Sequence, residues 1–529
     1  MLTLQNISYI HPNKDLLFDT VCLTVNNHEK IALIGNNGTG KSTLLKIIAG
    51  ELQASGGQIN IGTEPYYIPQ IFGHINHLTI AQALKIEGKL NAFKEILHGN
   101  ATEENFNLLN DDWSIEERCK NALIYWQLTG LDWLQKMETL SGGEKAKVFL
   151  AGISIHEPEL VLLDEPSNHL DLSGRQLLYD FIQSTQSALV VVSHDRKLVN
   201  LLHAVCELSK HGIRVYGGNY DFYSEQKQVE ENALNQDIQS KEKELRKAKE
   251  KERETLERQE RQNSRGKKQQ KKEGTPQMLI DKMKNDAEKS TSKLKGVHAE
   301  KIGNISQELQ HLRSSLSGMD KMKLGFDNSR LHRGKILITA KGMNFSYNTQ
   351  ALWEENLNFQ IMSGERIALK GINGSGKTTL IKLILGNIEP QTGTIDRASK
   401  QSVYIDQDYS LIDNELSVYE QAQKFNIFAL QEHEVKIRLN RFLFTKEAWD
   451  KSGIALSGGE RMRLALCCLT INSQSPDLIV LDEPTNNLDI QNIKILTNAI
   501  NEYQGTLIVV SHDETFLEQI NVERTIQLG

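Results

Sequence analysis

Two stretches of the sequence, GNNGTGKS at 35–42 and GINGSGKT at 371–378, each combine three glycines with a lysine and a hydroxyl residue. Glycines allow successive backbone N–H groups to turn towards an anion, and the lysine adds a positive charge. Such a loop is typical of a site that holds the phosphates of a nucleotide and offers its last hydroxyl to Mg²⁺. The candidate residues are Gly35, Asn36, Asn37, Gly38, Thr39, Gly40, Lys41, Ser42 and Thr43 and, in the second stretch, Gly371, Ile372, Asn373, Gly374, Ser375, Gly376, Lys377, Thr378 and Thr379.

A pair of acids ends an apolar segment downstream of each phosphate loop, in VLLDE at 161–165 and IVLDE at 479–483. One carboxylate at the end of such a strand can hold the shell of a Mg²⁺ ion, and the next can polarise an attacking water. The pattern therefore predicts hydrolysis of the bound nucleotide. The predicted Mg²⁺ residues are Ser42, Asp164, Thr378 and Asp482, and the predicted water-activating residues are Glu165 and Glu483.

Each phosphate loop must lie between a strand and a helix, and the sequence supplies both. The apolar runs IALI and IALK precede the loops, and the helical patterns TLLKIIAG and TLIKLILG follow them. The segments LSGGE and VVSHD also recur in the same order, so the chain contains two homologous copies. We predict an α/β fold with two P-loop ATPase domains, a first cassette at 1–223 and a second at 335–529.

The first copy is longer than the second between two shared landmarks. Gln70 and Ser141 are 71 positions apart, whereas Gln407 and Ser457 are 50 apart. The surplus is a short insertion at about 88–112, for which we expect a surface loop.

The LSGGE sequences resemble the signature of ATP-binding-cassette (ABC) ATPases, and the resemblance covers both copies. It implies ATP and Mg²⁺ as cofactors and a head-to-tail pairing, in which Lys41 works with Ser457 and Lys377 with Ser141. It also implies roles for further residues: the signature residues Ser141, Gly142, Gly143, Ser457, Gly458 and Gly459, the Q-loop residues Gln70 and Gln407, the switch histidines His194 and His512, and the adenine-stacking residues Tyr9 and Tyr347. For the two tyrosines, packing on an edge strand is an equal alternative. Neither copy lacks a catalytic group, so both sites are expected to hydrolyse ATP.

The segment 224–334 between the cassettes differs from them in composition. Residues 224 to 335 contain 27 Lys or Arg against 19 Asp or Glu, which leaves 34 against 49 for the rest of the chain. Apolar residues at near-heptad steps predict helical arms, marked by Ile238, Leu245 and Leu256 in the first and by Ile302, Ile305, Leu309, Leu312, Leu316 and Met319 in the second. The helix breakers Gly266, Gly274 and Pro276 separate the arms. We predict an antiparallel coiled-coil hairpin with its basic tip at about Arg261 to Lys272.

A basic tip on an otherwise acidic chain favours contact with the phosphates of a polyanion, although a solvated charge run is the usual alternative. The lack of a base-reading motif favours folded RNA over a DNA sequence. Two cassettes joined by a charged helical linker resemble the ABC-F family of translation factors. This resemblance implies binding of the ATP form to the ribosome, with the linker directed towards the P-site tRNA and the peptidyl-transferase region and release upon hydrolysis, in translation regulation or antibiotic resistance by ribosome protection. The alternatives are the ATP-hydrolysing subunit of a transporter and a DNA-repair or chromosome-associated ATPase.

Composition places the chain among cytoplasmic proteins. Its 529 residues are 39% hydrophobic and 24% charged, and the apolar runs are too short to span a membrane. The N-terminus has neither a basic start nor an apolar signal core, and the five cysteines show no C-x-x-C spacing. We therefore expect no stable membrane association and a monomer in which the two cassettes pair.

Overall fold

The computed structural model describes residues 1–70, 73–270, 277–315, 334–347, 350–372, 374–398, 401–471 and 476–528. The chain separates into two compact units. The first contains Met1–Phe222 together with Met322–Gly529, and the second contains Tyr223–Lys321. Both predicted cassettes thus belong to one unit, and most of the predicted linker, up to Lys321, belongs to the other. The domain limits at 223/224 and 334/335 stay a prediction.

The first cassette is built around a six-stranded sheet in the order β5-β6-β7-β3-β8-β9. Strands β8 and β9 pair antiparallel, and the other pairs are parallel. Strands β3, β6 and β7 are buried along their whole length, as expected for apolar runs covered on both faces. The strands are β3 (Lys30–Ile34), β5 (Tyr66–Ile68), β6 (Leu160–Asp164), β7 (Ala188–Val192), β8 (Ala204–Ser209) and β9 (Gly212–Tyr216).

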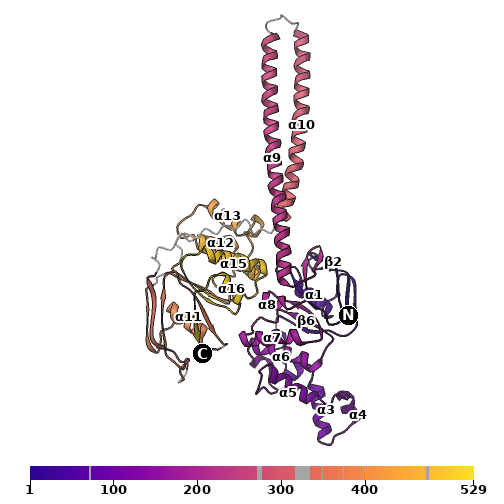
Figure 1. Ribbon diagram of the computed structural model, residues 1–529, viewed down its shortest axis with the longest axis vertical. Helices are drawn as coiled ribbons and strands as arrows, with labels where there is room; N and C mark the ends of the chain where they lie inside the picture. Colours follow the sequence, from indigo (N-terminus) through magenta and orange to yellow (C-terminus); the bar gives the residue numbers. More distant parts are fainter. Residues whose placement is uncertain are drawn as a thin grey trace. The chain divides into compact units, whose positions relative to one another are not determined.

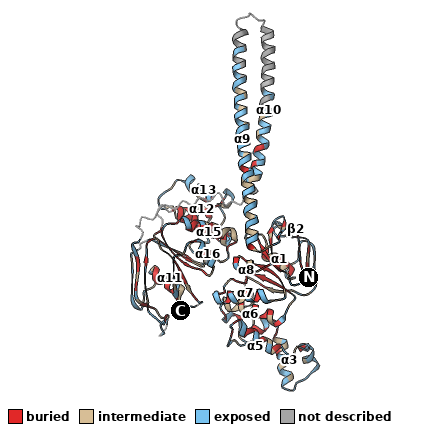
Figure 2. Ribbon diagram, viewed as in Figure 1, coloured by how far each residue is buried: buried red, intermediate tan, exposed pale blue. Residues whose placement is uncertain are grey.

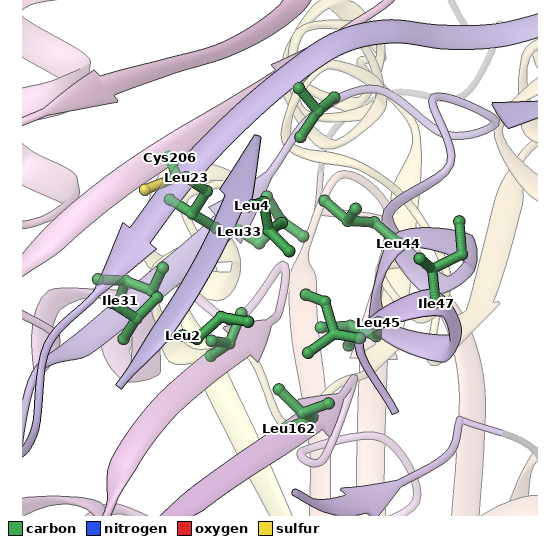
Figure 3. Close-up of a cluster of buried hydrophobic side chains, with 14 of the residues drawn as sticks. Leu2, Leu4, Leu23, Ile31, Leu33, Leu44, Leu45, Ile47, Leu162 and Cys206 are labelled. Carbon is green, nitrogen blue, oxygen red and sulfur yellow. The ribbon is translucent and has the colours of Figure 1, made fainter. Parts of the chain in front are cut away.

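A three-stranded antiparallel sheet, β2-β1-β4, and a set of helices complete the first cassette. The strands are β1 (Leu2–Ile10), β2 (Leu16–Val25) and β4 (Gly56–Ile61). The main helices are α1 (Lys41–Ile48), α2 (Ile80–Ala83), α5 (Ile115–Tyr125), α6 (Gly142–His156), α7 (Leu172–Ser184) and α8 (Arg196–Asn200). Helix α1 packs into a continuous apolar core: Leu44 and Leu45 meet Leu2, Leu33 and Leu162 from β1, β3 and β6 (Figure 3). This core fixes the strand and the helix that hold the first phosphate loop between them.

The second cassette repeats this plan with a five-stranded sheet, β14-β15-β16-β12-β17, and a three-stranded sheet, β11-β10-β13. Its strands are β10 (Ile336–Asn344), β11 (Leu357–Met362), β12 (Arg366–Gly371), β13 (Thr392–Arg397), β14 (Ser402–Ile405), β15 (Leu478–Asp482), β16 (Thr506–Val510) and β17 (Arg524–Leu528). Its helices include α11 (Lys377–Leu385), α12 (Val418–Lys424), α13 (Glu432–Arg441), α14 (Gly458–Ile471), α15 (Ile490–Glu502) and α16 (Glu514–Gln519). The predicted α/β fold with two similar cassettes is confirmed.

The insertion at about 88–112 is helical, so the expectation of a surface loop is wrong. Helices α3 (Glu87–Leu97) and α4 (Glu103–Leu109) pack against each other, and Thr102 caps the second through a bond from the backbone N–H of Asn105. Asp112 then pairs with Lys89 at 2.9 Å and with Arg118 at 2.8 Å. These ion pairs tie the two ends of the insertion together, which composition alone did not indicate.

The linker contains two long helices that lie side by side, α9 (Tyr220–Gln270) and α10 (Gln277–Ser315) (Figure 1). Ile238, Ile305 and Leu309 are buried between them, whereas most of the other described side chains of the pair are exposed (Figure 2). Ion pairs join the helices across this seam, Lys241 to Glu308 at 2.6 Å and Arg313 to Glu242 at 2.5 Å. The predicted antiparallel helical hairpin is thereby confirmed.

One helix breaker does not act as predicted. Gly266 lies inside α9, because a single glycine costs a helix only about 1 kcal/mol and the helix continues to Gln270. The other predicted breakers, Gly274 and Pro276, lie outside the described residues, as do Lys271, Lys272, Leu316 and Met319.

Candidate functional site

The first phosphate loop joins β3 to α1 and closes around its own lysine. Gly35, Gly38 and Gly40 have φ angles of 153°, 82° and 96°, a backbone that side chains rarely allow. Nζ of Lys41 donates to the carbonyl oxygens of Gly35 at 2.8 Å and Asn36 at 3.3 Å. Burial lowers the pKa of this lysine, and nearby carboxylates oppose the shift. The loop thus presents a preformed cradle with a buried cation, as its sequence predicts.

The second phosphate loop joins β12 to α11 in the same way. Gly374 and Gly376 have φ angles of 83° and 87°, and Nζ of Lys377 donates to the carbonyl oxygen of Gly371 at 2.8 Å. Asn373 lies outside the described residues. The two copies therefore build the same loop from different sequences.

The candidate water-activating glutamates share an unusual backbone conformation directly after β6 and β15. The φ angle is 51° at Glu165 and 48° at Glu483, in the left-handed region that costs a non-glycine residue about 1–2 kcal/mol. Each peptide N–H nevertheless donates to the neighbouring strand, to the carbonyl oxygen of Val192 or Val510 at 2.8 Å. The sheet thus holds both glutamates in a conformation that the sequence alone would disfavour.

The candidate Mg²⁺ residues offer oxygen atoms at the carboxyl ends of these strands. Asp164 ends β6 and is buried, and its Oδ1 atom has no hydrogen-bond partner within the described part of the protein. Ser42 lines the same cavity as Asp164. Carboxylate and hydroxyl oxygens suit Mg²⁺, so these residues fit the expected ion. Asp482 and Thr378 occupy the equivalent positions at β15 and α11.

The switch histidines lie against the glutamates in both copies. Nε2 of His194 is 3.4 Å from Oε1 of Glu165, and Nε2 of His512 is 3.4 Å from Oε1 of Glu483. The backbone N–H of His194 also donates to Oε2 of Glu165 at 3.3 Å. The structure therefore brings each predicted glutamate and histidine together as a pair.

Burial dominates the protonation of these groups. It raises the pKa of Glu165, against the opposing charge of Lys41, and raises the pKa of Glu483 to about 7, against that of Arg175. Burial also lowers the pKa of His512 to about 4. Without nucleotide, the site thus favours the uncharged forms of its acid and its imidazole.

A cavity of about 400 Å³ contains much of the first site and receives residues from both cassettes. The phosphate-loop residues Gly38 and Lys41 line it together with Glu165 from the first cassette, while Ser457 and Gly458 come from the second. The predicted partners Lys41 and Ser457 therefore line one cavity. The pairing of Lys377 with Ser141 stays a prediction.

Sequence reasoning missed the segments that follow the acids, SNHLD at 167–171 and TNNLD at 485–489. The backbone N–H of Asn37 donates to Oδ2 of Asp489 at 2.7 Å, and its Nδ2 donates to the carbonyl oxygen of Asn487 at 2.9 Å. Nε2 of Gln70 donates to Oδ1 of Asn487 at 3.3 Å. The recurrence of this segment in both copies could have identified it as part of the site from the sequence. His11, which also lines the cavity, had no signal in the sequence.

The two signature serines cap helices. Ser141 precedes α6 and accepts a hydrogen bond from the backbone N–H of Glu144, whose carboxylate bonds back to the serine N–H at 2.8 Å. Ser457 makes the same pair of bonds with Glu460 at the start of α14. Each arrangement places a hydroxyl and backbone donors at a helix N-terminus, which is suited to an anion.

The remaining predicted residues differ between the copies. Tyr9 is partly buried and packs against the core residue Phe18, with ring centroids 6.3 Å apart. Tyr347 is exposed, and its hydroxyl lies 3.0 Å from Oγ1 of Thr379 in the first turn of α11. Gln407 is exposed at the surface. The packing alternative thus has direct support at the first tyrosine, whereas the second lies beside a phosphate loop.

Comparison with known proteins identifies a family model and relatives that match this chain. The model of the family described as "ABC transporter" matches residues 18–168 and 355–486. "ABC transporter F family member 2" of Arabidopsis thaliana is 30% identical, over 99% of this chain and 76% of the relative. "ATP-binding protein Uup" of Haemophilus influenzae is 29% identical, over 99% of this chain and 78% of the relative.

Solved structures show the same fold at lower identity. "RNase-L Inhibitor" has a TM-score of 0.60 and 20% identity, over 98% of this chain and 87% of that one. A structure of "archaeal ribosome recycling factor aABCE1" in complex with a ribosomal stalk protein has a TM-score of 0.59 and 19% identity, over 99% and 87%.

Fold and site together define a twin-cassette P-loop ATPase. The chain belongs to the ABC family, as the signature sequences predicted, and within it to the F group, as the two cassettes joined by a charged helical linker predicted. Within the part of the chain that the structure describes, no helix has the length and apolarity required to cross a membrane.

Proposed function

We propose that this ABC-F ATPase binds the ribosome in its ATP-bound form, directs its linker towards the P-site tRNA and the peptidyl-transferase region, and dissociates when ATP is hydrolysed. The proposal combines the two nucleotide sites, which would set the lifetime of the complex, with the basic end of the linker, which would contact RNA.

The site residues would divide the work of hydrolysis between binding and chemistry. Lys41 and Lys377 would bind the β- and γ-phosphates, and each signature serine would reach the γ-phosphate from the opposite cassette. Glu165 and Glu483 would accept the proton of the attacking water, each oriented by its histidine neighbour at 3.4 Å. The preformed phosphate loops and the shared cavity support this assignment.

Each site would hold one Mg²⁺ ion with its ATP, through Ser42 and Asp164 in the first cassette and through Thr378 and Asp482 in the second. When bound, the ion neutralises charge on the phosphates and orients them. The buried Oδ1 of Asp164, which has no hydrogen-bond partner among the residues that the structure describes, supports this placement.

The distribution of charge along α9 is the observation that carries the ribosome proposal. Residues 241–260 contain eight Lys or Arg and seven Asp or Glu, and ion pairs join Arg246 to Glu250 and Arg253 to Glu257. Residues 261–272 contain six basic residues and no acid. Arg261 and Arg265 are exposed on the helix. An excess of basic residues at one end of a helix about 76 Å long is suited to a phosphate backbone.

Two of the similar solved structures also support an association with the ribosome. One contains a ribosome recycling factor, and another is titled "Model of ribosome-bound archaeal Pelota and ABCE1". Their identity to this chain is low, so they add to the charge argument and do not replace it.

Co-sedimentation with 70S ribosomes tests the proposal. The variant Glu165→Gln/Glu483→Gln should bind ATP without hydrolysing it and should pellet with ribosomes in ATP, whereas wild type should pellet poorly after turnover. Equal pelleting of both proteins would contradict the proposal. Stimulation of ATPase activity by a membrane protein, and not by ribosomes, would favour the transporter alternative.

A second experiment tests the linker itself. Replacing Arg261, Arg265, Lys267 and Lys268 by Gln should weaken ribosome binding and reduce its salt dependence. A matched control replaces four basic residues within the charge-balanced part, Lys243, Lys247, Lys249 and Lys251. An unchanged salt slope in the first variant, or an equal loss in the control, would show that the tip does not contact phosphate.

A further inference from the structure

A tyrosine touches the strand-end aspartate in both cassettes. The hydroxyl of Tyr404 donates to Oδ2 of Asp482 at 2.9 Å, and the hydroxyl of Tyr67 donates to Oδ2 of Asp164 at 3.5 Å. In each copy the tyrosine lies three residues before the Q-loop glutamine, in YIPQ and YIDQ. The same contact thus arises twice, from two sequences that differ around it.

The register of the sheet explains why the contact forms. Tyr67 on β5 pairs with Leu162 on β6. Side chains alternate along a strand, so Asp164, two residues beyond Leu162, lies on the same face as the tyrosine. Two residues advance a strand by about 6.6 Å, which a tyrosine side chain spans. On the second sheet Tyr404 pairs with Val480, and Asp482 again lies two residues on.

The neighbouring tyrosine shows that this contact depends on the face of the sheet. Tyr66 precedes Tyr67 on β5, and its side chain lies on the opposite face. Its hydroxyl donates to the carbonyl oxygen of Phe149 in α6 at 3.1 Å. Tyr67 instead packs against the core cluster that contains Leu162. The two adjacent hydroxyl groups therefore serve different partners, one a helix backbone and the other a carboxylate.

The hydrogen bond uses only one oxygen of the carboxylate. In Asp164, Oδ2 is bound by the tyrosine, while Oδ1 is buried without a partner among the described residues. Tyr67, Asp164, Ser42 and Gln70 line one cavity of about 320 Å³. The tyrosine thus occupies Oδ2 and leaves Oδ1 without a partner among the described residues, in a carboxylate that lines the same cavity as Ser42.

We propose that Tyr67 and Tyr404 are positioning residues that orient the carboxylates of Asp164 and Asp482 towards the Mg²⁺ of bound Mg·ATP. The inference rests on the Mg²⁺ role proposed above for these aspartates. Hydrogen bonds to a metal-ligating carboxylate fix its orientation, and their loss typically lowers metal affinity 10–100-fold. In this role the tyrosines would act through the carboxylates to which they donate.

The test measures how strongly Mg²⁺ promotes nucleotide binding. A fluorescent ATP analogue is titrated against the hydrolysis-deficient protein Glu165→Gln/Glu483→Gln, first in EDTA and then over a series of Mg²⁺ concentrations. Adding Tyr67→Phe and Tyr404→Phe together should raise the Mg²⁺ concentration required for half-maximal binding about tenfold. Binding in EDTA should stay unchanged. The control Tyr66→Phe, which loses a hydroxyl from the same strand, should leave the Mg²⁺ requirement unchanged.

Each outcome bears on the inference. An unshifted Mg²⁺ requirement in the tyrosine variant overturns it, and so does a loss of affinity that is equal in EDTA and in Mg²⁺, because that is the result of a general structural role. If the parent protein binds nucleotide equally well with and without Mg²⁺, the proposed Mg²⁺ residues and this inference fall together. Each single Phe variant gives an independent test, should the double variant not fold.

Discussion

The buried glutamate of the second cassette makes stability depend on pH in a direction opposite to that of an ion-paired carboxylate. Burial raises the pKa of Glu483 from 4.5 to about 7 in the folded protein. The folded state therefore holds a proton that the unfolded chain has lost at the same pH. The stabilisation from this proton is complete below about pH 4.5 and disappears as the pH rises to about 7.

The variant Glu483→Gln removes this dependence while keeping the shape of the side chain. The difference between a pKa of 4.5 and one of about 7 corresponds to about 3 kcal/mol, so the variant should exceed wild type in free energy of unfolding by up to that amount above pH 8. For a domain of this size, 1 kcal/mol shifts Tm by roughly 2–4 °C, which predicts a rise of roughly 6–12 °C in the transition of the second cassette. At pH 5 the two proteins should unfold within a few degrees of each other.

Differential scanning fluorimetry of nucleotide-free protein in EDTA, from pH 5 to pH 9, measures this difference. His512 adds its own pH dependence below about pH 6.5, because burial lowers its pKa to about 4 in the folded protein, but both proteins carry this histidine and its contribution cancels in the comparison. The control Glu355→Gln removes an exposed carboxylate and should leave Tm unchanged. A Tm difference that is constant across the pH range, or that grows towards acid, would refute the assignment of a buried, protonated glutamate.

Three further changes give measurable effects elsewhere in the molecule. Leu309→Asp places a charge in the buried seam of the linker and should speed hydrogen exchange throughout α10, whereas the exposed control Gln307→Asp should not. Gly152→Ala brings a methyl group against Tyr66 of β5 and should lower the free energy of unfolding by about 1–3 kcal/mol. In the control Gly88→Ala the added methyl group meets open space in α3, so this variant should not be destabilised. Thermal unfolding of the two variants measures the difference. Lys377→Ala should reduce the stoichiometry of ATP binding from two to one in calorimetry of the hydrolysis-deficient protein, and a stoichiometry of two would show that this loop does not depend on its lysine.

The sequence predicted the features that depend on a short stretch of backbone. Glycine spacing determines the phosphate loops, and alternation of apolar strands with helices determines the α/β cassettes, so both could be read locally. The heptad steps around Ile305 and Leu309 located the linker seam because a coiled coil buries every third or fourth residue. The ABC signature motifs identified the family.

Features that depend on contacts between distant segments were not predicted. The bond between Tyr404 and Asp482 follows from the register of two strands, and the bond between Asn37 and Asp489 joins residues 452 positions apart. Neither can be derived from one motif. The helices of the insertion were missed because its ends are fixed by the ion pairs of Asp112, whose partners lie on either side of it in sequence.

The left-handed backbone at Glu165 and Glu483 has a consequence for how these positions can evolve. Glycine would relax each turn and strengthen the fold, yet it would remove the carboxylate that we propose to activate water. Selection for stability and selection for ATP turnover therefore oppose each other at these two positions. Glycine or asparagine in place of either glutamate would indicate a cassette that binds nucleotide and no longer hydrolyses it.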